Sequence, residues 1–523
     1  MGQPSSGADA GDSADSQADT QREVERKLRV HALFRLPELD GLSPRVSTID
    51  RQDTRSMTAV YHDTEDLRLF RWGVTLRRRE GGNDAGWHMK LPVEGEGQGV
   101  RDELQVPLED GEVGDVPAAL SDLVTSLARE APLVPVATLR TERIPFWLLD
   151  DEGNPLAELV DDTVSVIDAD HIAARFRELE VEALSEEGLD VLDEVAAFLI
   201  DHGAVPGGTS KAAHALGPRA SAAPDVETRG AVCPDDPAGD AVRAHLAKHV
   251  RRFLLQDVRV RRDLPDSVHQ MRVAARRLRS GLKVFAPLVD AEWSAHLRGE
   301  LGWIAGELGR VRDTEVLLER MCRHAEELDE PDRTRAVETI ERVLGAEFDA
   351  ARDHALTAMR SQRHRDLLVS LVDAVHHPHL TEAANRPCSE VLVEPVDKAF
   401  AKLAKKVHKL DPDGDAHPWH EARIIAKRAR YAAEMVAPVF GRPAKRLAES
   451  LEGVTELLGD HQDCHVSQLE TRVIADRPDV DGSSGFALAL LHEREIEREH
   501  RLRAQFDELW PNVVKVYRKT EMA

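Results

Sequence analysis

Acidic side chains occur at alternate positions in two short segments of the first half of the chain. Because successive side chains of a β-strand point to opposite faces, residues two apart share one face of a strand. Paired carboxylates suit hard divalent cations such as Mg²⁺ or Mn²⁺, which take oxygen ligands and can bridge phosphate oxygens. These acids are Glu23 and Glu25, and then Glu178, Glu180 and Glu182.

Basic side chains follow the same alternation in the segments between the acids. Lysine and arginine are the side chains that best hold phosphate groups. A solvated charged face would explain any single strand. If the sheet closes into a barrel, however, all the charged faces can line one lumen, and a metal-bound polyphosphate would compensate their burial. The cations in this pattern are Lys27, Arg77, Arg79, Lys90 and Arg101.

The first 216 residues have the mixture of strand-length and helical segments that is typical of an α+β domain. Gly, Pro, Asn and Asp separate several strand-length segments, and apolar spacing predicts helices over 116–129 and 188–203. The first part is therefore predicted to have a strand-rich core. Its predicted strands span 22–30, 73–80, 86–92, 101–108, 155–168 and 175–184.

The second half has the spacing of helices rather than the alternation of strands. A segment rich in Pro, Gly and Ala at 217–238 is predicted to be a linker. Residues 239–515 are almost entirely long segments with helical spacing, which predicts an all-α part.

This helical part repeats itself. Residues 268–288 align with 419–440, and a second block starting with Glu307 aligns with one starting with Leu457 at nearly the same offset. Two matched blocks at one offset indicate an internal duplication, with repeats at about 239–390 and 391–515.

Each repeat places a cationic stripe on one face of an amphipathic helix. Like charges four residues apart, such as Arg272 and Arg276, repel by roughly 0.2–0.5 kcal/mol. A solvated face is the ordinary explanation, but a bound polyanion would reverse the repulsion, and released counterions would add affinity. Without interleaved aromatic residues for base stacking, a featureless phosphate chain is favoured over nucleic acid. The stripes comprise His269, Arg272, Arg276, Arg279 and Lys283, and His420, Arg423, Lys427 and Arg430.

A family resemblance adds to this interpretation of the first half. The run Glu23-Val24-Glu25-Arg26-Lys27 is an ExExK signature, followed in order by LRRR, HMKLP, RDE, LAELVDD, ELEVE and Ser210-Lys211. This order resembles the CYTH superfamily, the triphosphate tunnel metalloenzymes, over residues 21–216. The resemblance implies an eight-stranded antiparallel tunnel that hydrolyses or cyclises triphosphate groups with Mg²⁺ or Mn²⁺.

The resemblance also implies roles for matching positions. The sequence TLRTER offers Arg140 as an alternative to Arg143. No protein nucleophile is implied, and the sequence has no GxSxG, Walker loop or HExxH motif. Implied metal ligands are Glu23, Glu25, Glu180 and Glu182, with Glu158, Asp161 or Glu178 as further candidates. Implied catalytic cations are Lys27, Arg77, Arg79 and Lys90, and implied substrate-binding residues are Arg101, Arg143 and Lys211.

Residues 239–515 resemble the CHAD domain, a conserved histidine α-helical domain. The resemblance is carried by His269, His420, the flanking Arg and Lys residues and the RD and QD blocks. It implies two pseudo-symmetric helical bundles with a basic cavity that binds inorganic polyphosphate. Gln462 stands where the first repeat has Arg312, which predicts that the two repeats hold phosphate differently.

Composition excludes several other classes. The 523 residues include 69 Lys and Arg against 95 Asp and Glu, a net charge of −26, which argues against a general nucleic-acid binder. Four cysteines without a CxxC pair argue against a disulfide framework and favour a reducing cytoplasm. No apolar run reaches the roughly 18 residues that a membrane helix needs. Residues 1–20 are predicted to be a solvated tail.

The sequence thus predicts a cytoplasmic α+β protein: a CYTH-like tunnel over 21–216, a linker, and a duplicated CHAD-like bundle over 239–515. Its predicted partners are inorganic triphosphate or polyphosphate, with neither a membrane nor specific nucleic acid. The expected activity is metal-dependent triphosphate hydrolysis. The alternatives are a nucleotide cyclase and a non-catalytic polyphosphate scaffold associated with granules.

Overall fold

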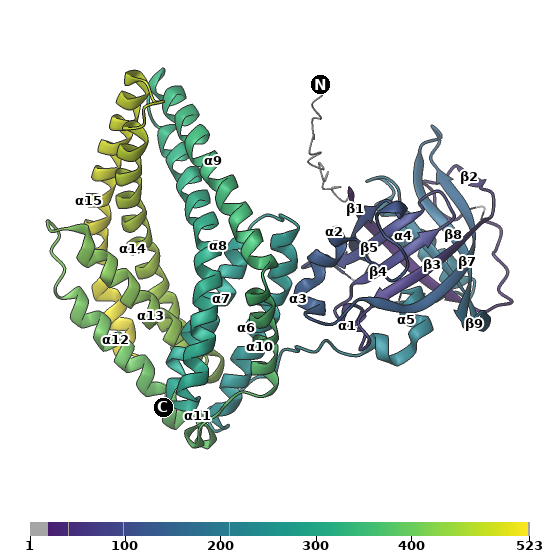
Figure 1. Ribbon diagram of the computed structural model, residues 1–523, viewed down its shortest axis with the longest axis horizontal. Helices are drawn as coiled ribbons and strands as arrows, with labels where there is room; N and C mark the ends of the chain where they lie inside the picture. The colour runs from purple at the N-terminus through teal and green to yellow at the C-terminus, as the bar shows by residue number, and fades with distance from the viewer. Residues whose placement is uncertain (1–18, 40, 98, 209, 521–523) are drawn as a thin grey trace, which may run out of the picture. The chain divides into compact units, whose positions relative to one another are not determined.

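The computed structural model of the chain describes residues 19–39, 41–97, 99–208 and 210–520 (Figure 1). The predicted N-terminal tail lies outside the described residues up to residue 18, and residues 19 and 20 begin the first strand. The chain divides into two compact units, Met1–Asp225 and Val226–Ala523, and the division falls inside the segment predicted to be a linker. Asp225 accepts a hydrogen bond from Trp72 in the first unit, whereas Val226 is buried in the second.

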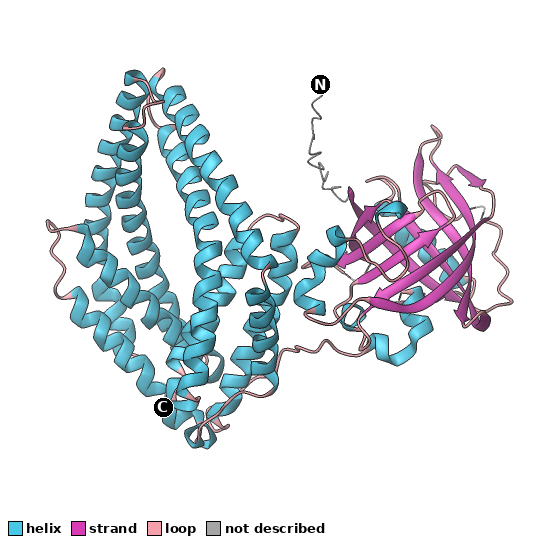
Figure 2. Ribbon diagram, in the orientation of Figure 1, coloured by secondary structure: helices cyan, strands magenta, loops and turns pink. Residues whose placement is uncertain are grey.

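Eight strands close into an antiparallel barrel in the first unit (Figure 2), which confirms the predicted fold class. The strand order is β1-β6-β5-β4-β3-β7-β8-β9, and β9 pairs with β1 to close the barrel. Two short strands, β2 (Thr48–Arg51) and β10 (Val205–Gly207), pair with β7 and β1. The barrel strands are β1 (Asp19–Val30), β3 (Arg55–Asp63), β4 (Thr75–Glu80), β5 (Gly86–Pro92), β6 (Val100–Val106), β7 (Val134–Leu149), β8 (Pro155–Asp168) and β9 (His171–Ala183).

Strands β3 and β7 are not among those that the sequence pattern predicts. Strand β7 contains Pro135 and Pro145, which lack the N–H that a ladder needs and so weaken a strand prediction. In the fold β7 nevertheless pairs with β3 on one side and β8 on the other along most of its length. Tertiary pairing therefore outweighs local propensity here.

Short helices cover the barrel and close one end of it. The predicted helix at 188–203 is α4 (Leu189–Asp201), whose buried Leu192 and Leu199 pack on the outer face of the barrel. The predicted helix at 116–129 is instead broken into α2 (Ala118–Ser121), η2 (Asp122–Val124) and α3 (Thr125–Ala128). Ala212 of α5 (Lys211–Leu216) packs with Leu139 and other inward-facing apolar residues, forming an apolar plug. The remaining short elements are α1 (Arg68–Arg71), η1 (Leu108–Asp110) and η3 (Gly217–Ser221).

The second unit consists of helices, as predicted (Figure 2). Helix α7 packs on α8 and α8 on α9, and the same order recurs as α13 on α14 and α14 on α15. Contacts between α7 and α13 and between α9 and α15 join the two halves. None of the helices among the described residues combines the length and apolarity needed to cross a bilayer. The helices are α6 (Ala238–Arg261), α7 (Ser267–Val284), α8 (Ala291–Ala325), α9 (Asp332–Arg360), α10 (Gln362–His376), α11 (Cys388–Val391), α12 (Val393–Val407), α13 (Ala416–Phe440), α14 (Arg442–Ala475) and α15 (Gly482–Arg518), with η4 (Ala286–Leu288) and η5 (Glu382–Asn385) between them.

Candidate active site and anion-binding surface

The strand register turns the alternating charges toward the inside of the barrel. Directly paired residues share one face of a sheet, and the register pairs Glu25 with Glu182 and Lys90 with Glu103. The inward faces enclose a cavity of about 320 Å³. Most of the site residues predicted in the first half line it: Glu23, Glu25, Lys27, Arg77, Arg79, Lys90, Arg101, Arg143, Glu158, Glu180, Glu182 and Lys211.

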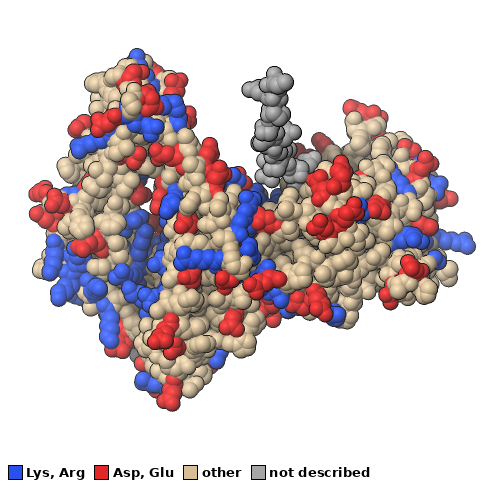
Figure 3. Space-filling model, viewed as in Figure 1, with Lys and Arg blue, Asp and Glu red and all other residues tan. Residues whose placement is uncertain are grey.

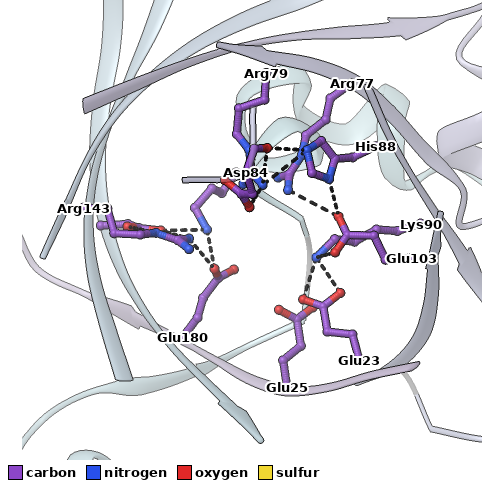
Figure 4. Close-up of polar contacts among 12 residues, drawn as sticks. Glu23, Glu25, Arg77, Arg79, Asp84, His88, Lys90, Glu103, Arg143 and Glu180 are labelled. Carbon is purple, nitrogen blue, oxygen red and sulfur yellow. Dashed lines mark hydrogen bonds and ion pairs between the residues drawn. The ribbon is translucent and has the colours of Figure 1, made fainter. Parts of the chain in front are cut away.

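The arginine-rich wall and the β1 carboxylates lie on opposite sides of this cavity, and each side also carries groups of the other sign (Figure 4). Arg77, Arg79 and His88 gather on one wall, while Glu23 and Glu25 project from the other. Asp84 and Glu103 contact Arg79 and Arg77 on the arginine side, while Lys90 contacts Glu23 on the other. A polyphosphate with a divalent cation has the complementary arrangement of charge.

Buried ammonium groups hold the carboxylates in place. Lys27 Nζ lies 2.9 Å from Glu25 Oε2 and also contacts Glu180. Lys90 Nζ lies 2.5 Å from Glu23, and Lys211 Nζ lies 2.6 Å from Glu180 Oε2. In a site of low dielectric such pairs offset the cost of burying each charge.

The pKa values of the acids differ according to these partners. Burial opposes ionisation of Glu25, but Lys27 and Lys90 outweigh it and lower its pKa. Glu182 has no such partner at ion-pair distance among the described residues. Burial and the neighbouring Glu23 raise the pKa of Glu182 to about 8.

The residues present fit a hard divalent cation. Among the described residues no group of three or more acidic, histidine or cysteine side chains is already arranged to hold a metal ion, and the ammonium groups of Lys27 and Lys90 contact the acids. The donors are nevertheless all carboxylate oxygens, the type that Mg²⁺ and Mn²⁺ prefer. Burial first, and then the charge of Glu23, disfavour ionised Glu182, and a bound cation would oppose both effects.

Two arginines on the cationic wall lack acceptors for part of their hydrogen-bonding capacity. The Nε groups of Arg77 and Arg79 are buried and have no hydrogen-bond partner among the described residues. Burial, followed by Arg77 and Arg143, lowers the pKa of Arg79 to about 9. Unsatisfied guanidinium donors beside like charges favour a bound anion.

Asp161, a predicted candidate metal ligand, lies on the outer face of the barrel, which corrects that prediction. It pairs across the sheet with Leu179, whose side chain belongs to the outer core, and its carboxylate accepts hydrogen bonds from Arg177. Its neighbour Asp162 is the inward acid: it is fully buried and accepts hydrogen bonds from Arg143. Counting in twos from Glu158 leads to position 162 and would have identified it.

The other site residues predicted in the first half either line the cavity or lie outside it. Arg143 lines the cavity, whereas Arg140 is exposed on the outer face, so the structure favours Arg143 as the candidate. Glu178 is buried 2.8 Å from Lys211 but does not line the cavity. Glu158 lines the cavity and accepts a hydrogen bond from Trp147.

The sequence analysis did not assign a role to Glu103. Its Oε1 lies 3.0 Å from His88 Nδ1 and 3.5 Å from Arg77 Nη2. Burial opposes ionisation, but His88, Lys90 and Arg77 lower the pKa of Glu103. Its position two residues after Arg101 in RDELQ was the available signal.

In the helical unit, the cationic stripes of α7 and α13 face each other. Burial together with Arg423 and Arg276 lowers the pKa of Lys427 to about 7. Burial and Arg272 likewise lower the pKa of Arg276, whose Nε has no hydrogen-bond partner among the described residues. Cations from two separate helices thus crowd together with incomplete compensation.

The repeated glycines lie next to arginines of the stripes, at distances where a Cβ would make ordinary van der Waals contact. A Cβ at Gly309 of α8 would lie 3.5 Å from the guanidinium of Arg272, and one at Gly459 of α14 would lie 3.9 Å from that of Arg423. Arg272 also donates to the Gly309 carbonyl and to Asp313 at 3.0 Å. Each repeat therefore lays an arginine of its cationic stripe across a glycine of the next helix.

The histidines that begin the two stripes have different neighbours. His420 Nδ1 lies 2.6 Å from Gln462 Oε1. Burial and Arg312 lower the pKa of His269. The difference follows the exchange of arginine for glutamine between the repeats.

Two other residues of the stripes, Arg430 and Lys283, differ from Lys427 in their charged neighbours. Arg430 pairs with Glu434 at 2.7 Å and also contacts Glu452, so its charge is compensated. Lys283 lies near a different group of cations, including Arg428, which together with burial lowers its pKa. Figure 3 shows Lys and Arg side chains gathered over α12 and α13.

Comparison with known proteins identifies both parts. The model of the CYTH domain matches residues 21–203, and that of the CHAD domain matches residues 244–472. The uncharacterised protein Rv2226 of Mycobacterium tuberculosis is 34% identical over 518 residues, covering 95% of this chain and 97% of that protein.

Two solved structures are also similar. PptA from Streptomyces chartreusis shares 23% identity, with a TM-score of 0.45, over 53% of this chain and 100% of that one. The CHAD domain of the plant Ricinus communis shares 25% identity, with a TM-score of 0.44, over 54% of this chain and 95% of that one.

Proposed function

The chain belongs to the proteins that combine a CYTH domain with a CHAD domain, and on that basis we propose that its barrel hydrolyses inorganic triphosphate while its helical unit binds inorganic polyphosphate. The observation that carries the first proposal is the charged cavity, in which the buried Nε groups of Arg77 and Arg79 have no partner among the described residues and lie across from the β1 carboxylates. The described lining of the cavity is dominated by charged groups suited to phosphate and a metal ion, with Tyr61, His88 and Asn83 among its few aromatic and amide groups.

Each wall has a part in the proposed reaction. Glu23, Glu25, Glu180 and Glu182 would hold Mg²⁺ or Mn²⁺, which supplies charge neutralisation at phosphate oxygens when bound. Arg77 and Arg79 would bind the phosphate oxygens from the opposite wall, stabilising the charge that develops as the phosphoanhydride bond breaks. Lys27, Lys90, Arg143 and Lys211 orient the carboxylates and add positive charge around the same cavity.

Side-by-side turnover assays test the hydrolase proposal. The full chain is incubated with tripolyphosphate or ATP, with Mg²⁺ or Mn²⁺, and both orthophosphate and cyclic nucleotide are measured. We expect orthophosphate from tripolyphosphate at a higher rate than from ATP. Formation of cyclic AMP would favour a cyclase, and the absence of turnover with both substrates would favour a non-catalytic scaffold.

The second proposal rests on the converging stripes of α7 and α13 and predicts a pH dependence. A bound polyanion stabilises the charged form of Lys427, so its pKa rises from about 7 on binding and a proton is taken up. Its charged neighbours are Arg272, Arg276, Arg423 and Asp463. Polyphosphate affinity should therefore be highest below pH 7 and fall several-fold as the pH rises to 9.

The Lys427→Arg variant is the control for this pH dependence. Arginine keeps its charge across this range, so the variant should lose most of the fall in affinity, as measured by calorimetry at pH 6, 7, 8 and 9. Titration of the terminal phosphates affects both proteins equally. Parallel curves for the two proteins would contradict the assignment to Lys427.

A further inference from the structure

Arg55 is a cation of the barrel cavity that the sequence pattern did not single out. It is the first residue of β3 and pairs across the sheet with Arg143, so the two side chains share the inner face. It lines the same cavity as the carboxylates and the arginine wall. Ala59 and Tyr61, further along β3, belong to the apolar plug, so Arg55 lies toward the opposite end of the strand.

The charge of Arg55 is uncompensated within the described part of the chain. No carboxylate among the described residues lies within ion-pair distance of it. Its cross-strand neighbour Arg143 differs, because Arg143 Nη2 lies 2.7 Å from Asp162 and 3.2 Å from Glu180. Arg143 thus uses its donors for carboxylates, whereas Arg55 keeps its donors for an anion in the cavity.

The other cations that line the cavity indicate which anion Arg55 would bind. The other cations that line it and contact carboxylates, such as Lys27, Lys90 and Lys211, are placed to serve the triphosphate and its metal ion. Arg55 stands at the start of its strand, beyond the residues that pair with Arg77 and Arg79. If a triphosphate lies between the arginine wall and the β1 carboxylates, a longer linear chain that extends toward the start of β3 brings its next phosphate to Arg55.

We propose that Arg55 forms a subsite for a fourth phosphate, so that the barrel takes linear polyphosphates in preference to triphosphate itself. The inference deepens the proposed hydrolase function and rests on it. Chains would enter from the end away from the plug, since α5 and its apolar neighbours close the other end.

The test compares tripolyphosphate with tetrapolyphosphate. Calorimetry uses the full chain carrying Arg272→Glu and Arg423→Glu, which suppresses binding by the helical unit, with and without Arg55→Gln. We expect Arg55→Gln to weaken tetrapolyphosphate binding about tenfold and tripolyphosphate binding less than about twofold, as for the loss of one charge-assisted hydrogen bond. KM values for orthophosphate release should follow the same pattern, with kcat little changed.

The matched control is Arg140→Gln, which removes an exposed arginine on the outer face of neighbouring β7 and should alter neither affinity. Equal losses for both ligands, or no loss for either, would overturn the proposal. So would a barrel that binds both chain lengths equally before Arg55 is changed. A length preference that depends on Arg55 in a protein that releases no phosphate would uphold the subsite and refute the hydrolase.

Discussion

Replacing Glu23 and Glu25 together by glutamine should reduce orthophosphate release from tripolyphosphate by at least about a hundredfold. Both carboxylates are buried in the barrel cavity, where they would contribute most of the negative charge for a divalent cation on the β1 side. Glutamine keeps their size but removes that charge. Polyphosphate binding by the helical unit should be unchanged, because that binding depends on the α7 and α13 stripes.

The controls separate chemistry from folding. Glu142→Gln changes an exposed acid on the outer face of β7 and should leave turnover intact. Loss of both acids also removes partners from Lys27 and Lys90, so the thermal midpoint of each variant must be measured alongside its activity. Retained turnover in a folded double variant would contradict the proposed role of these acids.

Arg272→Glu combined with Arg423→Glu should weaken polyphosphate binding by about a hundredfold at low salt. Each substitution removes one cation from the converging stripes and introduces a charge that repels phosphate. The slope of log affinity against log salt should also become shallower, by roughly 0.7 for each phosphate that is no longer neutralised by a side chain. Filter binding or calorimetry across a series of salt concentrations measures both effects.

A second pair of substitutions, without charge reversal, controls for misfolding, because the glutamate introduced at position 272 would face Asp313. Arg272→Gln with Arg423→Gln should show the same trend at smaller size. Arg335→Glu with Lys445→Glu reverses two surface cations elsewhere in the helical unit and should change little. If the stripe variants bind as the original protein does, the stripe is only a solvated face.

Much of the candidate site could be predicted because strand alternation is a local property. Once Glu23, Glu25 and Lys27 were assigned to one strand, their common face followed from the two-residue period. Asp161 is a different case, because it lies an odd number of residues from Glu158 and so faces the other side of the strand. Asp162, an even number of residues away, shares the inner face. The same reasoning passed over Arg55, which lies in a strand that the sequence pattern did not reveal.

The helical unit shows a similar division. The repeat located α7 and α13 and placed their cations on one face, since a helix of 3.6 residues per turn makes that face readable from spacing alone. Spacing could not show that Arg430 is compensated by Glu434 and Glu452, while Lys427 is crowded by cations from another helix. Those neighbours come from packing between helices.

By itself, the amino-acid sequence determined which side chains share a face, where the two parts meet, and which families they resemble. These features depend on short-range geometry and on residue order. Only the tertiary structure decided that the charged faces turn inward, because that requires β1 to pair with β9, bringing Lys27 opposite Glu180. Barrel closure is a contact between distant segments, and it brings the charged faces of separate strands together in one cavity.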